Sequence, residues 1–499
     1  MKLSSLIKGL NYKILQGDIE VEINHVQCDS RRIREGDLFI CIAGMTVDGH
    51  LFIDEAIDKK ASVIITEKNI TKKQSVTIIQ TENTGYLTGI IYSRYYGEPS
   101  RKLKVIGITG TKGKTTTTYM IQNMLNRLGC NTGLMGTIEV NYNDIHYPLQ
   151  NTTPEPSVLH RYLREMVDAS VEAVVMEVSS QGLMLDRVAG VDFDYGIFTN
   201  ISEDHIGKNE HKSFDEYLRW KAKLFSLCKV GIINRDCHYS SFVIDNAKCP
   251  VFTYGKDNIS DYRAYNPSLY FSEGRLGIKY MLTGNRKDII EVGMPGEFSM
   301  YNSLAAVSLL DLMGKDIAPV KDALKSLCVK GRVEVLDVST KFTVIIDYAH
   351  NALSLESLLI SLREYRPDRI ITIFGCGGNR DRGRRFKMGN VSARLSDLTI
   401  LTNDNPRYEE PMDIISDIIK GIEEKNGNYL VYPERKEAIR KGLLMAREGD
   451  ILVLAGKGHE NYQDIQGVKY PMDERALIRE ILEEEDVTKI CGYNNRYFA

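Results

Sequence analysis

Short apolar runs of strand-forming residues alternate with helical patterns along most of this chain of 499 residues. Strands that alternate with helices form largely parallel sheets, and the helices cover both faces of each sheet. The alternation therefore predicts an α/β fold. The strand-like runs are residues 38–42, 63–65, 105–108, 173–176, 195–199, 231–233, 343–346, 370–374, 398–401 and 451–454.

The length of the chain predicts roughly three domains at about 150 residues each. The sequence contains no internal repeat and no low-complexity linker, so the boundaries are placed by pattern. One boundary falls before the apolar run that begins at Lys104, and another falls near Gly331. We expect an N-terminal domain at 1–100, a central domain at 101–330 and a C-terminal domain at 331–499.

Charge and cysteine usage limit the class of protein. The net charge of −3 and the pI of about 6.4 do not fit a general nucleic-acid binder. No run of 18 apolar residues suggests a membrane span, and the N-terminal residues are too mixed for a signal peptide. The nine cysteines form no CxxC pairs, as expected for reduced thiols. We expect a cytoplasmic enzyme.

The segment 107–118 reads GITGTKGKTTTT and ends like a phosphate-binding P-loop. A strand-like run precedes it, and a helical pattern that ends near Gly129 follows it. Strand, glycine loop and helix are the context that a phosphate site requires, because the N–H groups at the helix start face an anion. Ile108 stands where the usual spacing has a glycine, so the loop is short. The alternative is a Gly/Thr-rich turn with a surface lysine.

Three residues near this loop are candidates for phosphate and magnesium chemistry. Lys114 places a positive charge on the terminal phosphates, and the Thr115 hydroxyl suits Mg²⁺. Glu177 directly follows the run 173–176 and is either a magnesium ligand or a cap of the next helix. His205 follows the run 195–199, and this place near a strand end favours a functional role over that of an ordinary surface histidine.

Lys221 lies in an expected helix over 214–225. Phe214, Tyr217 and Leu218 share its side of the helix at three- and four-residue spacing, whereas Lys223 points elsewhere. An unpaired charge on an apolar face is costly, so this lysine has either a specific role or a path to the surface along its aliphatic stem.

Four apolar runs of the C-terminal region end directly in polar loops, at 347–351, 375–383, 403–407 and 456–460. Ligands of open α/β sheets bind outside the carboxyl ends of the strands, so these loops predict one shared site. Arg407 is able to grip a carboxylate with two hydrogen bonds. The arginines in and directly after the second loop, at 380, 382, 384 and 385, form either an anion site or a solvated basic patch.

Together these residues resemble the Mur ligase family of ATP-dependent, amide-bond-forming enzymes. The resemblance runs from Cys28 to Gln463, and the short loop Gly110–Thr115 matches the family's own form of the P-loop. It implies three α/β domains: an N-terminal UDP-binding domain, a central P-loop ATPase-like domain with a parallel sheet, and a Rossmann-like C-terminal domain. It also implies ATP as a substrate and Mg²⁺ as a cofactor.

The resemblance carries residue roles onto this sequence. Lys114, Glu177, His205 and Lys221 match catalytic positions, with Thr115, Glu177 and His205 as magnesium ligands and Lys221 as a carbamylated lysine. ATP-contacting positions are matched by Gly110, Thr111, Lys112, Gly113, Lys114, Thr115, Thr116, Asn302, Arg332, Asp347 and His350. The UDP-sugar substrate is assigned to Ser30, Asn151, Thr152, Thr153, Ser179 and Arg187. The incoming amino acid is assigned to Arg385, Asp404, Asn405, Arg407, Gly456 and Glu460.

Within the family, the chain is similar to enzymes that add the third residue of the peptidoglycan stem peptide. The form Asp404-Asn-Pro-Arg407 resembles enzymes that add meso-diaminopimelate, in which the arginine binds the distal carboxylate. We therefore expect ligation of meso-2,6-diaminopimelate to the D-glutamate γ-carboxyl of UDP-N-acetylmuramoyl-L-alanyl-D-glutamate through an acyl phosphate. We also expect a monomer that binds small molecules and no nucleic acid.

Two alternatives remain open at this point. One is the same chemistry with another acceptor, such as L-lysine or a glutamate chain. The other is a nucleotide-binding paralogue without turnover. The chain departs from the family pattern at Ser299, Asn351, Phe386 and Glu434, and none of these positions is a proposed catalytic group.

Overall fold

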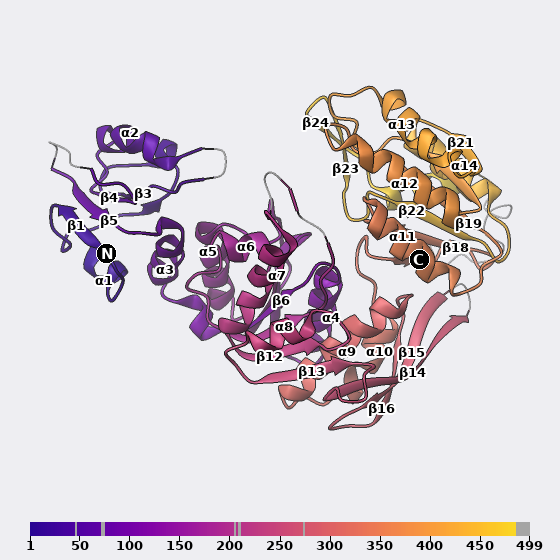
Figure 1. Cartoon of the computed structure of the whole chain (residues 1–499), viewed down its shortest axis with the longest axis horizontal. Coiled ribbons are helices and arrows are strands. Elements are labelled where there is room, and N and C mark those ends of the chain that lie inside the picture. Colours follow the sequence, from indigo (N-terminus) through magenta and orange to yellow (C-terminus); the bar gives the residue numbers. More distant parts are fainter. Residues whose placement is uncertain (45–46, 71–74, 204–205, 208–210, 273–274, 486–499) are drawn as a thin grey trace. The chain divides into compact units, whose positions relative to one another are not determined.

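The structure is a computed structural model, and it describes residues 1–499 except 45–46, 71–74, 204–205, 208–210, 273–274 and 486–499. The chain divides into two compact units (Figure 1). The first contains Met1–Tyr262 and Ala305–Asp316, and the second contains Arg263–Leu304 and Ile317–Ala499. Within the described residues, no helix combines the length and apolar character that crossing a membrane requires.

The first unit begins with a small sheet of order β1-β5-β4-β3-β2, in which only the β1–β5 pair is antiparallel. Leu3, Leu6 and Ile7 of the first helix pack with Leu87 and Ile91 on one side of this sheet. The elements are α1 (Leu3–Ile7), β1 (Lys13–Gln16), β2 (Val26–Gln27), η1 (Ser30–Arg32), β3 (Leu38–Ile40), η2 (Gly49–Phe52), α2 (Ile53–Asp58), β4 (Val63–Thr66), β5 (Thr77–Gln80), α3 (Thr84–Tyr95) and η3 (Pro99–Lys102).

The larger sheet of the first unit has the order β13-β12-β11-β6-β10-β7-β8-β9, and it is parallel from β13 to β7. Its central strand β6 leads into the glycine loop. The elements are β6 (Lys104–Thr109), α4 (Lys114–Arg127), β7 (Thr132–Met135), β8 (Glu139–Tyr142), β9 (Ile145–Pro148), α5 (Pro156–Asp168), β10 (Ala173–Glu177), α6 (Ser180–Met184), β11 (Phe193–Phe198), α7 (Phe214–Ala222), η4 (Lys223–Ser226), β12 (Cys228–Asn234), α8 (Ser240–Asp245) and β13 (Val251–Gly255).

The second unit contains antiparallel strands and a second doubly wound sheet. The antiparallel strands have the order β16-β15-β14, and the wound sheet has the order β17-β18-β22-β19-β20-β21. The first elements are β14 (Tyr262–Ser272), β15 (Arg275–Thr283), β16 (Asp288–Val292), η5 (Ala318–Val320) and α10 (Lys321–Lys325). The helix α9 (Glu297–Leu312) is divided, because its residues up to Leu304 belong to the second unit and those from Ala305 belong to the first. The rest are β17 (Glu334–Leu336), β18 (Thr343–Asp347), α11 (Ala352–Arg363), β19 (Ile370–Phe374), α12 (Arg382–Leu395), β20 (Leu398–Leu401), α13 (Pro411–Glu423), β21 (Tyr429–Val431), α14 (Arg435–Met445), β22 (Ile451–Ala455), β23 (Tyr462–Ile465), β24 (Val468–Pro471) and α15 (Glu474–Glu484).

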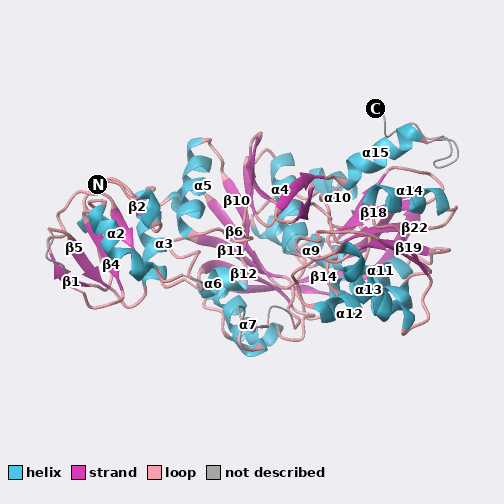
Figure 2. Ribbon diagram, turned by 90° about the horizontal axis from the view of Figure 1, so that it is seen from above, coloured by secondary structure: helices cyan, strands magenta, loops and turns pink. Residues whose placement is uncertain are grey.

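Alternate residues of the wound sheet enter two separate cores. Ile345 and Val453 pack with α11, α12 and α13, whereas their neighbours Val344 and Leu452 pack with α14 and α15. Figure 2 shows these two groups of helices on opposite faces of β18, β22 and β19. Burial on both faces explains why the strands are almost wholly apolar. The α/β prediction is confirmed, and the carboxyl ends of the strands are left to carry polar loops.

Most of the expected strands occur at or within a few residues of the predicted runs, and the helix after the glycine loop ends as predicted. Met120, Ile121, Met124 and Leu125 are buried on one face of α4, and Gly129 follows the helix with φ of 77°. The antiparallel strands β14–β16 were not predicted. The domain boundaries at 100 and 330 stay predictions.

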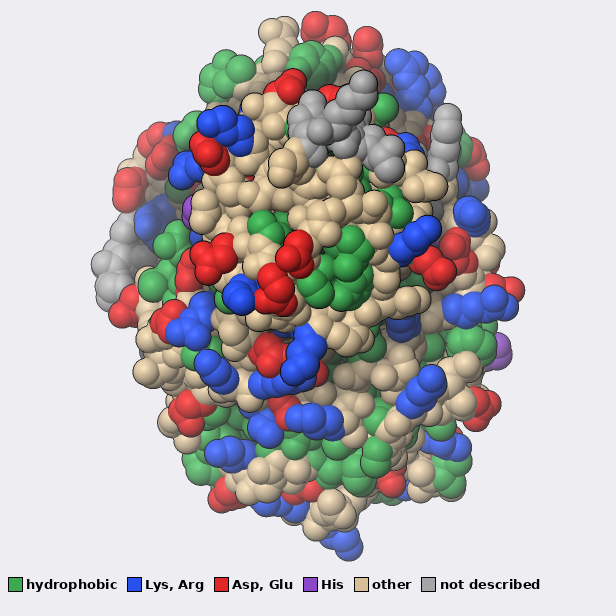
Figure 3. Space-filling view, turned by 90° about the vertical axis from the view of Figure 1, so that its left-hand side faces the viewer, with side chains coloured by type: hydrophobic (Ala, Val, Ile, Leu, Met, Phe, Trp, Pro, Cys, Tyr) green, Lys and Arg blue, Asp and Glu red, His purple; other side chains and the backbone are tan. Residues whose placement is uncertain are grey.

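Lys and Arg side chains intermingle with Asp and Glu side chains on the face drawn in Figure 3. This mixture accords with the small net charge of the chain.

Candidate active site

The glycine loop joins β6 to α4 with two residues in the left-handed region. Gly110 has φ of 150° and Gly113 has φ of 84°, and Gly113 is the N-terminal cap of α4. A Cβ on Gly110 would collide with the Thr199 hydroxyl. Both positions therefore require glycine, and the loop presents the start of a 14-residue helix to a ligand.

Two lysines from different helices converge on this loop. Lys114 Nζ donates to Gly110 O at 2.9 Å, and Lys221 Nζ donates to the same oxygen at 2.8 Å. Lys221 is 2% exposed and lies 4.6 Å from the centre of the Tyr217 ring. Lys223 points elsewhere, with 39% of its side chain exposed. The predicted orientation of Lys221 is therefore confirmed, and it is buried against the loop rather than extended to the surface.

Glu177 is the last residue of β10 and is 1% exposed. Its Oε2 accepts from Thr115 Oγ1 at 3.0 Å, and its Oε1 accepts from Thr137 N at 2.8 Å. The next helix, α6, is capped by Ser179, whose hydroxyl accepts from Gly182 N. The structure thus pairs Glu177 with the glycine loop and excludes it as the helix cap. Thr137 was not predicted from the sequence.

The candidate UDP-substrate residues of the central domain gather next to Glu177. Thr153 Oγ1 donates to Glu177 O at 3.0 Å and lies 3.1 Å from Ser179 Oγ. Arg187 Nη1 donates to Thr153 O at 3.1 Å, and Thr152 shares a hydrogen bond with Thr137 at 3.0 Å. Asn151, beside Thr152, is exposed.

Of the two other predicted residues of the first unit, the structure describes only Ser30, which lies in the small N-terminal sheet domain. Ser30 lies in η1, where its hydroxyl donates to Glu55 Oε2 at 2.9 Å. His205 lies outside the described residues.

The oxygen donors of Thr115 and Glu177 suit a magnesium ion. Among the described residues, no three His, Cys, Asp or Glu side chains come together as a metal-binding group. Mg²⁺ usually takes one or two carboxylates and completes its shell with water and substrate phosphates. A buried hydroxyl–carboxylate pair at the start of α4 fits that requirement.

Three of the four candidate ATP-contacting residues of the second unit surround Tyr348. The Arg332 guanidinium lies 4.9 Å from the centre of the Tyr348 ring, and His350 Nδ1 lies 2.8 Å from Tyr348 O. Asp347 Oδ2 accepts from Val333 N at 2.7 Å. The fourth candidate, Asn302, is buried in α9. Tyr348 was not predicted.

The six residues assigned to the incoming amino acid are called the amine site here: Arg385, Asp404, Asn405, Arg407, Gly456 and Glu460. Asn405 Nδ2 donates to Glu460 Oε2 at 2.9 Å. Asp404 lies so close to Gly456 that a Cβ there would stand 2.8 Å from Asp404 Oδ2. Lys457 lies in the predicted loop 456–460, but no role of its own was predicted for it.

The two arginines of the amine site have different surroundings. Arg407 adopts φ of 51°, donates from Nη1 to Gly378 O at 2.7 Å and places Nε 3.6 Å from Asp464 Oδ2. Arg385 is 1% exposed and bonds both oxygens of Glu409, at 2.8 and 2.9 Å. Burial opposes the charge of Arg385, but the ion pairs with Glu409 and Asp417 together outweigh it and raise the pKa of this guanidinium. Arg385 is thus no part of a solvated basic patch, whereas the Arg382 side chain is 75% exposed.

The four predicted polar loops lie at one end of the wound sheet. Their strands β18, β22, β19 and β20 are neighbours in that order, and they are parallel. Contacts cross between the loops: Arg384 donates to His350 O, and Arg407 donates to Gly378 O. The expectation that these loops lie together is confirmed, and their role as one ligand site stays a prediction.

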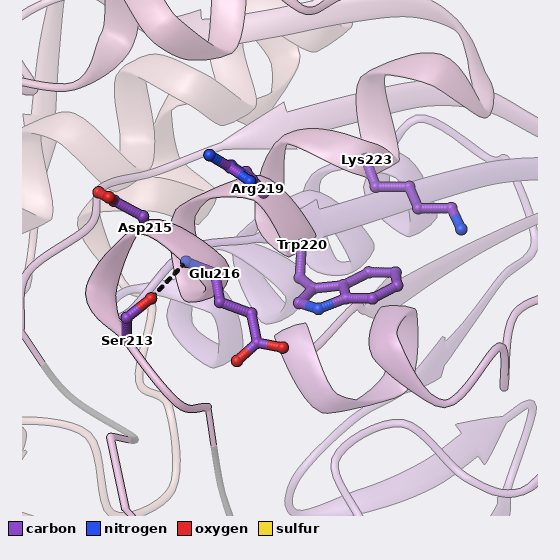
Figure 4. A pocket seen from close by; sticks show the side chains of 6 residues that line it. All are labelled: Ser213, Asp215, Glu216, Arg219, Trp220 and Lys223. Carbon is purple, nitrogen blue, oxygen red and sulfur yellow. Dashed lines mark hydrogen bonds between the residues drawn. The ribbon is translucent and has the colours of Figure 1, made fainter.

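A cavity of about 570 Å³ opens beside α7, apart from the predicted residues. Figure 4 shows Trp220, Glu216 and Lys223 around it, and the Ser213 hydroxyl accepts from Glu216 N. The remaining lining residues are Asp215 and Arg219.

Three family models match the chain in order. The description "Mur ligase family, catalytic domain" covers residues 22–93, "Mur ligase middle domain" covers 108–310, and "Mur ligase, glutamate ligase domain" covers 331–458. The chain belongs to the Mur ligase family. The family resemblance seen in the sequence is therefore confirmed, and with it a ligase scaffold of α/β domains.

Other Mur ligases match over nearly the whole chain. A protein of Clostridium perfringens named UDP-N-acetylmuramoyl-L-alanyl-D-glutamate–2,6-diaminopimelate ligase is 39% identical over 490 residues, which are 97% of this chain and 100% of that protein. A solved structure of a ligase with the same name has a TM-score of 0.70 and 26% identity, with 97% and 99% of the two chains covered. A MurF ligase of Thermotoga maritima, solved with ADP, has a TM-score of 0.56 at 18% identity, with 93% and 96% covered, and so shares the fold.

Proposed function

We propose that this chain ligates meso-2,6-diaminopimelate to the D-glutamate γ-carboxyl of UDP-N-acetylmuramoyl-L-alanyl-D-glutamate, with ATP as the second substrate. The observation that carries the proposal is the full-length similarity to proteins named for this reaction, at 39% identity. Arg407 in the amine site supports a substrate with a second carboxylate. We place this step of peptidoglycan precursor synthesis in the cytoplasm and assign it to a monomer.

The reaction has two chemical steps. An oxygen of the γ-carboxylate attacks the γ-phosphorus of ATP, ADP leaves, and an acyl phosphate forms. The amine of diaminopimelate then attacks the acyl carbon, loses a proton, and expels phosphate as the amide bond forms. The acyl phosphate must be shielded from water until the amine reaches it.

The residues around the glycine loop suit the first step. The N–H groups at the start of α4 bind the polyphosphate, and Lys114 exchanges its carbonyl acceptors for phosphate oxygens. Thr115 and Glu177 would hold Mg²⁺, which supplies neutralisation of charge on the transferred phosphoryl group. The hydroxyl of Thr153 and the guanidinium of Arg187 bind the UDP-sugar substrate beside Glu177.

Lys221 is proposed to carry a carbamate. A carbamate converts its buried ammonium into an anion next to the glycine loop, where an anion supports metal binding. Intact-protein mass spectrometry after incubation with bicarbonate tests this, with Lys221→Arg as the unmodifiable control. A carboxylated species that persists in the Arg variant would contradict the assignment.

The central test is mass spectrometry of a reaction with ATP, Mg²⁺, bicarbonate and the UDP-muramoyl dipeptide. Parallel samples contain meso-diaminopimelate, L-lysine or no amine. A product that contains one diaminopimelate residue, formed only with that amine, is expected. Addition of lysine would support the ligase activity and refute the role of Arg407. If folded protein formed no product with any amine, a paralogue without turnover would be favoured.

A further inference from the structure

Lys457 is a fully buried lysine within the amine site. It follows β22 in the loop after Gly456, and none of its side chain is exposed. Lysine is almost never buried without partners, because a desolvated ammonium is costly. A lysine at such a position therefore needs a specific reason.

The ammonium of Lys457 has three acceptors at hydrogen-bond distance. It donates to Tyr462 O at 2.6 Å, to Asn405 Oδ1 at 2.7 Å and to Glu460 Oε2 at 3.2 Å. An ammonium has three donors, so these bonds use all of them. Asp404 Oδ1 lies 3.6 Å away as a further ion-pair partner. Lys457 thus ties together the loops after β20 and β22.

These bonds determine how the amide of Asn405 is oriented. Its Oδ1 accepts from both Lys457 and the backbone N of Asp464, the latter at 2.8 Å. The amide nitrogen must then point the other way, where it donates to Glu460 Oε2. The amide of an asparagine can adopt two orientations that differ by exchange of its oxygen and nitrogen, and its hydrogen bonds decide between them. A cation beside the oxygen permits only one of these orientations.

The backbone around Lys457 has little freedom. Gly456 and Gly458 adopt φ of 108° and 53°. A Cβ at Gly458 would stand 2.8 Å from the backbone of Tyr348. The loop is packed against its neighbour, so the ammonium is held in a fixed position between Asp404, Asn405 and Glu460.

We propose that Lys457 is the positioning residue of the amine site: it fixes the Asn405 amide and the Glu460 carboxylate for a substrate that carries an ammonium and a carboxylate. This inference rests on the proposed function. Asp404 and Glu460 also place two carboxylates beside this one ammonium, a local pattern that favours the ammonium of an amino acid over a neutral ligand.

The test uses steady-state kinetics of the full-length protein with Lys457→Met and Lys457→Gln. We expect KM for diaminopimelate to rise by about 10- to 100-fold in Lys457→Met, because a misplaced binding group costs that much, with KM for ATP changed less than about threefold. Lys457→Gln keeps one donor for Asn405 Oδ1 and should lie between wild type and Lys457→Met. Lys469→Met is the matched control, because Lys469 contacts Tyr462 from an exposed position of β24.

A double variant separates positioning from general damage. If Lys457 acts through Asn405, Lys457→Met should cost far less in the Asn405→Ala background than in wild type. Additive losses, equal rises of both KM values, or failure of both Lys457 variants to fold would overturn the inference. Wild type is assayed with diaminopimelate and L-lysine in parallel. If it uses only L-lysine, the proposed substrate is wrong, and the Lys457 test is then read from KM for L-lysine.

Discussion

The glycine-loop site and the amine site hold their cations in different ways. At the glycine loop, Lys114 and Lys221 both donate to the carbonyl of Gly110. In the amine site, Lys457 lies 3.2 Å from a carboxylate oxygen of Glu460, Arg385 lies 2.8 Å from one of Glu409, and Arg407 lies 3.6 Å from one of Asp464.

The difference matches the ligands that the two sites are proposed to bind. A carbonyl is a neutral acceptor that a phosphate oxygen readily replaces, since charge-assisted hydrogen bonds are the stronger ones. Carboxylate partners instead balance the cations and leave a pattern of both signs, which suits an amino acid. We therefore predict that affinity for phosphate depends on backbone geometry, whereas selection of the amine depends on paired charges.

The largest effect is expected from Lys114→Met. The variant removes the charge proposed to face the transferred phosphoryl group, so kcat should fall by about 10³-fold or more. Phosphate release in the presence of all substrates measures it, and an unchanged thermal midpoint is the control for folding. Full activity would contradict this comparison of the two sites, because the ammonium of Lys114 would then have no role in the reaction.

Glu177→Gln keeps the shape of the side chain and removes its charge. We expect kcat to fall by about 100-fold and the Mg²⁺ concentration for half-maximal activity to rise, because a carboxylate in the proposed metal shell is lost. Thr137→Val is the matched control, since it removes one hydrogen bond to Glu177 and leaves the carboxylate. A normal Mg²⁺ dependence in Glu177→Gln would contradict the metal assignment.

Arg407→Ala addresses the amine site. Loss of a charge-assisted contact to the distal carboxylate should lower kcat/KM for diaminopimelate by about 10- to 100-fold. KM for ATP should stay near the wild-type value, and the ratio of kcat/KM for diaminopimelate to kcat/KM for L-lysine should decrease. Equal losses of kcat/KM for ATP and for diaminopimelate would show that Arg407 does not act specifically on the amine site.

The last prediction concerns stability rather than catalysis, namely the acid stability of the first unit. His160 on α5 is completely buried, and burial lowers its pKa to about 4 although Nε2 lies 3.0 Å from Ala189 O. A histidine with a lowered folded pKa stabilises the fold above its unfolded pKa of about 6.5, and this contribution is lost as the pH falls towards 4.

The shift in His160 corresponds to roughly 3 kcal/mol of unfolding free energy between these pH values. Denaturant titrations followed by circular dichroism at pH 7 and pH 4.5 should show a smaller acid loss in His160→Gln than in wild type. If both proteins lost the same free energy of unfolding between pH 7 and pH 4.5, His160 would be ruled out as a cause of the acid destabilisation.

The sequence was sufficient for the parts of the molecule that local pattern determines. The strand, loop and helix around Gly113 follow from apolar runs and glycine positions, and the buried side of α7 at Lys221 follows from helical spacing. The convergence of four loops follows from parallel strands.

Contacts between residues far apart in the chain could not be predicted from the sequence. Lys457 meets Asn405 across 52 positions of the chain, and Arg385 meets Glu409 across 24. Nothing local to Lys457 marks it as buried, because its burial depends on the order of β22 and β20 within the sheet. Thr137 meets Glu177 only because β7 lies beside β10.

Trp220 is the one tryptophan of the chain, and it stands next to Lys221 in α7. Its ring lies 5.0 Å from the ammonium of Lys223 at the cavity of Figure 4. All tryptophan emission therefore arises from a single helix beside the glycine loop. The protein carries its own optical probe: a nucleotide titration that shifts this emission reports a change around α7, with no label attached.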